Sequence, residues 1–222
     1  MNKILNKIVW LVIAAPLVYL AIIWNNLPER IVTSFSLDGN AERFGSKSEL
    51  LIIMGVLTAV NIALYLLLSN AYRLDARKYG KENKDRMGRM AFAISVYMSG
   101  LAIYLIHNSL GDGKPFNVRI MFGSMGLIWC IMGNYMHTIK PNNFAGFRTK
   151  WTLNNNENWR KTHLLGGKLW FTGGLLVAIS SFFTPLNIAI IVFTAMVVVS
   201  TFVPAIYSYR LHKKQKSLTV VN

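Results

Sequence analysis

Six apolar segments, each about 17 to 22 residues long, restrict what this chain can fold into more than any other feature. A helix needs about 20 apolar residues to cross the hydrocarbon core of a bilayer. The segments are 8–24, 50–70, 90–107, 120–138, 165–183 and 186–207. With 53% hydrophobic residues and a mean hydropathy of +0.37, little sequence remains for a soluble domain. We therefore predict an all-α integral membrane protein, a bundle of about six transmembrane helices.

The polar content of these segments limits the chemistry to expect. The chain has one cysteine, Cys130, so neither an internal disulfide nor a cysteine metal cluster is expected. Acidic and basic side chains are missing from the middle of every apolar segment, which argues against a proton-coupled transporter. The basic N-terminal start is similar to a signal peptide. However, the long apolar run contains Pro16 and lacks a small-residue cleavage site, so we expect a retained first helix.

The basic residues predict the orientation of the bundle. Nineteen of the 24 lysines and arginines fall in the two termini, the second loop and the fourth loop. The other five are Arg30, Arg43, Lys47, Lys114 and Arg119. The positive-inside rule then places both termini and the loop 134–173 in the cytoplasm. The net charge of +15 is explained by this topology and by contact with anionic membrane lipids, so direct nucleic-acid binding is not expected.

The first external loop, 25–49, has the pattern of a small hairpin cap. Residues 31–35 favour an extended strand, and Asp38-Gly39 favours a tight turn. A structured loop without a ligand is an equal alternative. We expect three regions: 1–49 with the first helix and the cap, 50–110 with two helices and a basic loop, and 111–222 with the last three helices and the loop 134–173. A turn-forming segment at 111–115 closes the third and fourth helices externally.

The loop 134–173 concentrates aromatic, polar and glycine residues. Four of the six tryptophans lie in it or beside it. Asn154 and Glu157 have the spacing of a capping box, so a helix should begin near Asn155 and continue into the fifth apolar segment. Intervals of three and four residues then put one stripe on that helix, formed by Trp159, His163, Gly166, Trp170 and Gly173.

Eight residues of this region are candidate binding residues, and we predict neither catalytic residues, metal ligands nor cofactors. They are Asn134, Asn143, Gly146, Arg148, Trp151, Trp159, Thr162 and His163. Arg148 has the chemistry to hold a phosphate or carboxylate with two hydrogen bonds. Alternatively, it pairs with Glu157 or caps a helix and fixes the loop. His163 has the chemistry of an acid, a base or a ligand, but a structural histidine is the favoured interpretation because converging donors are scarce. The tryptophans also suit interfacial anchoring.

These residues resemble the pattern of a known family. The sequence Gly146-Phe147-Arg148-Thr149-Lys150-Trp151-Thr152-Leu153, followed by Trp159, Thr162-His163 and Gly166, is similar to the core of the SdpI family of bacterial immunity membrane proteins. The earlier Leu27-Pro28, Asp38-Gly39 and Phe44-Gly45-Ser46-Lys47 resemble the small domain of unknown function that often precedes it. That pattern usually has a histidine where this chain has Ser34, which puts a binding role for the histidine in doubt here.

The resemblance implies a multi-pass protein of the bacterial cytoplasmic membrane that gives resistance to a secreted peptide toxin. It also implies signalling, because the best-described member holds a transcriptional repressor at the membrane. The expected partners are membrane lipids, a peptide toxin at the external face and a cytoplasmic regulator. The alternative function is transport of a small molecule or lipid. The third is a membrane enzyme acting on a lipid headgroup. The sequence shows no recognisable nucleophile–base pair or carboxylate pair for such an enzyme.

The orientation is directly testable with reporter fusions. Reporters fused at Gly80 and Asn156 should read cytoplasmic, and one at Gly113 should read external, because of the distribution of basic residues. An external signal at Asn156 would contradict the orientation and put the loop 134–173 in the wrong compartment.

Overall fold

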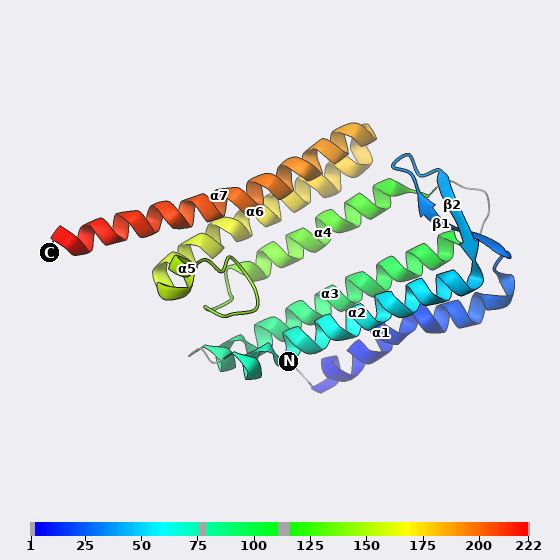
Figure 1. Cartoon of the computed structure of the whole chain (residues 1–222), viewed down its shortest axis with the longest axis horizontal. Coiled ribbons are helices and arrows are strands. Elements are labelled where there is room, and N and C mark those ends of the chain that lie inside the picture. The colour runs from blue at the N-terminus through cyan, green and yellow to red at the C-terminus, as the bar shows by residue number, and fades with distance from the viewer. Residues whose placement is uncertain (1–2, 76–78, 111–115, 222) are drawn as a thin grey trace. The chain divides into compact units, whose positions relative to one another are not determined.

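The computed structural model describes residues 3–75, 79–110 and 116–221, and helices make up most of it (Figure 1). The predicted turn at 111–115 lies outside the described residues. The elements in chain order are α1 (Lys3–Ile23), η1 (Trp24–Asn26), β1 (Arg30–Phe35), β2 (Ala41–Ser46), α2 (Lys47–Leu74), α3 (Gly80–Asn108), α4 (Val118–Met136), α5 (Lys150–Asn154), α6 (Asn156–Phe183) and α7 (Leu186–Val221). The prediction of an all-α membrane bundle is confirmed, with a helix at each of the six apolar segments.

Five of these helices, α1, α2, α3, α6 and α7, are long and apolar enough to cross a membrane. The sixth, α4, has only 19 residues, and three of them are glycines that lower its hydropathy. Two of these glycines lie against glycines of α6. A Cβ added to Gly126 would lie 2.5 Å from the carbonyl oxygen of Gly174, and one added to Gly133 would lie 2.7 Å from that of Gly167.

These contacts place α4 antiparallel to α6, because the residue number rises along one helix as it falls along the other. Small residues let two helix backbones approach closely. The two helices then contact each other at positions where larger apolar side chains would contact lipid. The helix α4 therefore packs closely against α6 from Gly126 to Gly133, and the glycines that lower its hydropathy make this contact possible.

The chain divides into two compact units, and each is described by itself. The first unit comprises described residues within 1–67 and 91–121. Its core includes Leu20, Ile31, Leu50, Met54 and Ile106. The predicted hairpin is confirmed: β1 and β2 pair antiparallel, with Arg30 opposite Ser46 and Phe35 opposite Ala41.

The hairpin turn depends on Gly39, whose φ of +82° lies in the left-handed region. Its carbonyl accepts a 2.9 Å hydrogen bond from the backbone N–H of Phe116. The ring of Phe116 stacks on Phe35 of β1, with 4.5 Å between ring centroids. The hairpin is thereby fixed to the chain that leads into α4. Ser34, where the resembled pattern usually has a histidine, donates from Oγ to Oε2 of Glu42 at 3.3 Å.

The second unit comprises described residues within 68–90 and 122–222. The helices α6 and α7 form a hairpin that turns at Thr184, whose N–H donates to the carbonyl of Ser180 at 3.0 Å. The segment 137–149 and the short helix α5 gather at the N-terminal end of α6 (Figure 1). This unit contains all eight candidate binding residues.

The close approach of α4 to α6 makes a testable prediction. Gly126→Ala would drive a Cβ into backbone atoms of Gly174 and Ala178, so we expect the free energy of unfolding to fall by about 1–3 kcal/mol. Thermal unfolding of the detergent-solubilised protein measures this. Gly55→Ala is the control, because no atom lies within 4 Å of its added Cβ. Equal stability of the two variants would contradict the proposed packing.

Candidate functional site

His163 occupies the centre of the region, and both of its ring nitrogens are hydrogen-bonded. The side chain is fully buried. Nε2 lies 3.0 Å from the backbone nitrogen of Phe147, and Nδ1 lies 2.8 Å from the carbonyl oxygen of Trp159. The amide can only donate and the carbonyl can only accept, so the imidazole is neutral and carries its proton on Nδ1. Its ring also stacks on Trp159, with 3.9 Å between centroids.

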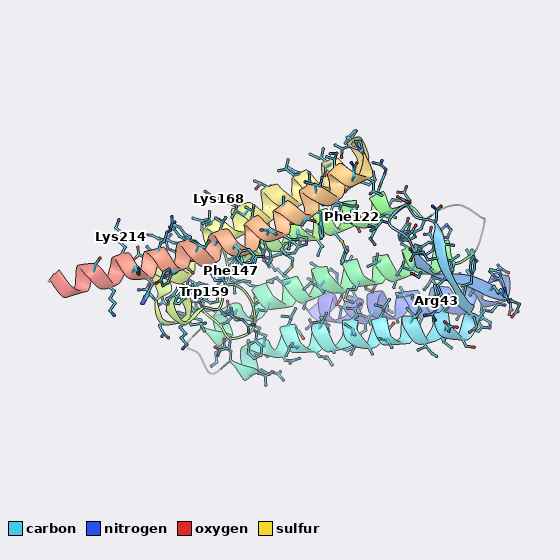
Figure 2. All side chains as sticks on the ribbon, turned by 45° about the horizontal axis from the view of Figure 1, so that its top comes forward. Arg43, Phe122, Phe147, Trp159, Lys168 and Lys214 are labelled. Atoms are coloured by element: carbon cyan, nitrogen blue, oxygen red, sulfur yellow. The ribbon has the colours of Figure 1, made fainter. Side chains whose placement is uncertain are left out.

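The segment 137–149, which we call the docked loop, inserts Phe147 against the face of α6 (Figure 2). The Phe147 ring lies edge-on to His163 at 5.7 Å and to Trp170 at 6.1 Å between centroids. It fits there because Gly166 has no side chain, and an added Cβ would overlap the ring. Gly146 turns the chain with a φ of +101°, and its own Cβ would overlap Nε2 of His163. The predicted stripe on α6 therefore receives a phenylalanine of the docked loop.

Two buried asparagines hold the backbone of the docked loop. The side-chain oxygen of Asn142 accepts from the N–H groups of Phe144 and Ala145, at 2.8 and 2.7 Å. Its amide nitrogen donates to the carbonyls of Lys140 and Ala145. Asn83, on α3, exchanges two hydrogen bonds with the backbone of Lys140, at 2.9 and 3.1 Å. A buried backbone needs such partners where no regular element supplies them.

The N-cap of α6 lies one residue after the predicted one. The N-cap of α6 is Asn155, whose side chain accepts from the N–H of Asn158 at 2.8 Å. The predicted start near Asn155 is confirmed, but the predicted Asn154–Glu157 box is wrong, because Asn154 is the last residue of α5. Glu157 instead pairs with Lys161, at 2.6 Å.

The short helix α5 was not predicted, and its cap is formed by two threonines. Thr149 and Thr152 form a reciprocal capping box, in which each backbone N–H donates to the other residue's hydroxyl. The signal was present in the sequence as two threonines three residues apart.

Four of the eight candidate residues lie at or next to the centre: Gly146, Trp159, Thr162 and His163. Trp159 is buried and donates from its indole N–H to the carbonyl of Ile139 at 2.8 Å. Thr162 is buried and donates to the side chain of Asn158, which in turn donates to the carbonyl of Ser208. These side chains hold the docked loop and α7 on α6.

The contacts of the other four candidates are with residues other than His163. Trp151 packs on α7, donating to Ser208 Oγ at 2.7 Å and stacking on His212. Asn143 donates to a carboxylate oxygen of Asp75 at 3.0 Å. Asn134 is exposed on α4. The eight residues thus share a region of the second unit without forming one cluster.

Arg148 contacts the docked loop itself, and its role in holding an anion stays a prediction. Its guanidinium donates to the carbonyl oxygen of Asn143, within the docked loop, and does not pair with Glu157. The side chain is otherwise exposed. It therefore fixes the conformation of the loop.

A cavity of about 450 Å³ lies beside Trp159. Three basic residues line it, namely Arg86 of α3, Lys140 of the docked loop and Arg160 of α6. Tyr79, His137, Asn156 and Glu157 add polar groups to its wall. In the sequence, these three cations served only to predict the orientation of the bundle. Their convergence was not predicted, because they lie 20 to 74 residues apart and only the fold brings them together. The described residues contain no group of three or more histidine, cysteine or acidic side chains suited to a metal ion.

Comparisons with known proteins agree with the sequence resemblance. Residues 138–208 match the model of the SdpI/YfhL protein family, and residues 11–59 match a domain of unknown function, DUF1648. The chain is 26% identical over 195 residues to the Immunity protein SdpI of Bacillus subtilis (strain 168), covering 87% of this chain and 88% of that protein. No solved structure matches the chain.

The family match covers all but the first residue of the docked loop, all of α5 and α6, and α7 as far as Ser208. The second match covers the hairpin cap. Together with the apolar helices, these matches identify a multi-pass cell membrane protein. The chain thus resembles the SdpI/YfhL protein family over residues 138–208 and also matches DUF1648 over residues 11–59.

Proposed function

We propose that this chain is a membrane immunity protein, which protects the cell that makes it against a secreted peptide toxin. One observation carries the proposal: the likeness to the Immunity protein SdpI extends through 87% of this chain and 88% of that protein. The likeness therefore includes both the external cap and the cytoplasmic region, and it is not limited to one pair of helices. A shared fold alone does not determine function, so an immunity protein of this kind must also offer a surface that suits a peptide.

The external cap offers such a surface. An apolar cavity of about 220 Å³ lies between the β1 strand and the helices beside it. Phe35, Leu37, Ile53, Met54 and Phe116 are among its lining residues. Pockets for drug-sized ligands have volumes of about 300–1,000 Å³. The smaller cavity suits one apolar side chain of a longer peptide, with the exposed edge of the hairpin available to the peptide backbone.

The cytoplasmic end of α7 supports a second part of the proposal, the docking of a regulator. Gln215 on α7 lies beside Glu157, at the start of α6, so the residues that follow extend past the end of α6. Arg210, Lys213 and Lys214 lie in the turns just before Gln215, and Lys216 follows it; all four are exposed, and Figure 2 shows Lys214 pointing outward. A basic helix end of this kind would attract an acidic surface of a soluble protein.

The state of His163 supports binding rather than catalysis. The residue with the best acid–base chemistry in the region has both nitrogens engaged by backbone groups. A general base must have a free lone pair within reach of the proton it removes. We infer that the region recognises and transmits instead of reacting.

A protection assay tests the proposal. Deleting the gene should sensitise the bacterium to peptides in the culture supernatant of its parent strain, and expression of the chain should restore growth. Leu37→Asp should lower protection about tenfold or more, because it puts a charge at the mouth of the apolar cavity where Leu37 is 62% exposed.

Ala41→Asp is the matched control, since it adds the same charge at an exposed position of β2 that does not line the cavity. Membrane abundance of each variant must equal that of the wild type. Full protection by Leu37→Asp would overturn the role of the cap. Undiminished growth of the deletion strain would overturn immunity itself.

A further inference from the structure

The cavity beside Trp159 has a wall whose charge is unbalanced. Arg86, Lys140 and Arg160 bring three positive charges to it, and Glu157 is the one carboxylate among its lining residues. Glu157 is already engaged by Lys161 at 2.6 Å and by the side-chain amide of Gln215 at 3.3 Å. The carboxylate therefore does little to neutralise the three cations.

Arg86 is the most informative of these cations. Its Nη1 atom is shielded from solvent, and it has no hydrogen-bond partner among the described residues. A shielded guanidinium nitrogen without an acceptor costs free energy, which an anion in the cavity would recover through charge-assisted hydrogen bonds. Lys140 and Arg160 are exposed, so they are free to move toward such an anion.

The neutral groups of the wall also suit an anion. Asn156, the first residue of α6, donates from its side chain to the hydroxyl of Tyr79 at 2.7 Å, which leaves the phenolic proton available to another acceptor. The start of a 28-residue helix adds a partial positive charge at the same place. The volume of about 450 Å³ exceeds that of a single phosphate ion and leaves room for the group that carries it.

We propose that this cavity binds a phosphate group, carried either by an anionic membrane lipid or by a free phosphorylated small molecule. A phosphate has several oxygens, and each guanidinium can donate two parallel hydrogen bonds to them. Two arginines and a lysine therefore suit a phosphate better than they suit an anion with a single acceptor atom. This ligand goes beyond the proposed immunity function. Because the docked loop and α6 both contribute to the wall, occupancy would stabilise the junction that joins them.

Thermal unfolding of the purified full-length chain in neutral detergent tests the site with two probes. The first is inorganic phosphate, compared with chloride at equal ionic strength. The second is phosphatidylglycerol, compared with phosphatidylcholine. A ligand that binds only the folded state raises the unfolding temperature in a concentration-dependent way. We expect at least one probe to do so, and its apparent Kd to rise about tenfold or more in Arg86→Gln and in Arg160→Gln.

Arg89→Gln is the matched control, because Arg89 is an exposed arginine of the same helix that does not line the cavity. Its affinity should stay within about twofold of the wild type, since it would lose only screened long-range attraction. Stabilisation by phosphatidylglycerol alone assigns a lipid headgroup, and stabilisation by phosphate assigns a soluble ligand. The proposal is overturned if neither probe stabilises the chain, or if Arg89→Gln weakens binding as much as Arg160→Gln. Arg160 is exposed, so this comparison does not depend on the folding of the Arg86 variant.

Discussion

The hydrogen bond from the Phe147 amide to Nε2 of His163 is the interaction on which the cytoplasmic region of the second unit depends. It is made by a neutral ring whose other nitrogen is held by the carbonyl of Trp159, one turn earlier on α6. The bond fixes Phe147 over Gly166, and this sets the position of the loop backbone that Asn142 and Asn83 then complete. A protonated imidazole could not accept the amide, so docking of the loop and neutrality of His163 are one constraint.

A second constraint comes from the membrane, where backbone groups must be satisfied internally and helices associate through close packing. The helix α4 meets it by presenting Gly126 and Gly133 to α6. The result is a helix pair that leads directly from the bilayer into the docked loop. Trp159 and Thr162, which the sequence motif suggests as binding residues, form hydrogen bonds that hold this junction together. The part of the region left for a partner is the cavity wall and the exposed end of α7.

The sequence was sufficient for the features that depend on periodicity and composition. Six apolar segments became six helices, and Asp38-Gly39 became the hairpin turn. It was insufficient where neighbouring residues of one type compete, because any of Asn154, Asn155 and Asn156 has a side chain suited to an N-cap and only the path of the chain selects Asn155. It also failed for groups that meet through the fold, since Arg86 and Arg160 belong to different helices. The contact of Arg148 with the Asn143 carbonyl likewise could not be predicted, because it depends on the path of the docked loop.

The protonation state of His163 tests the central claim most directly. Nitrogen NMR of the full-length chain with labelled histidine, in detergent or lipid nanodiscs, distinguishes the two neutral tautomers from the imidazolium, and His163→Gln assigns the signal. The account predicts one tautomer at neutral pH, protonated on Nδ1 and unprotonated on Nε2, with an Nε2 signal that shifts when Gly146→Ala displaces the loop. An imidazolium, or a proton on Nε2, would contradict it, because neither form can accept the Phe147 amide.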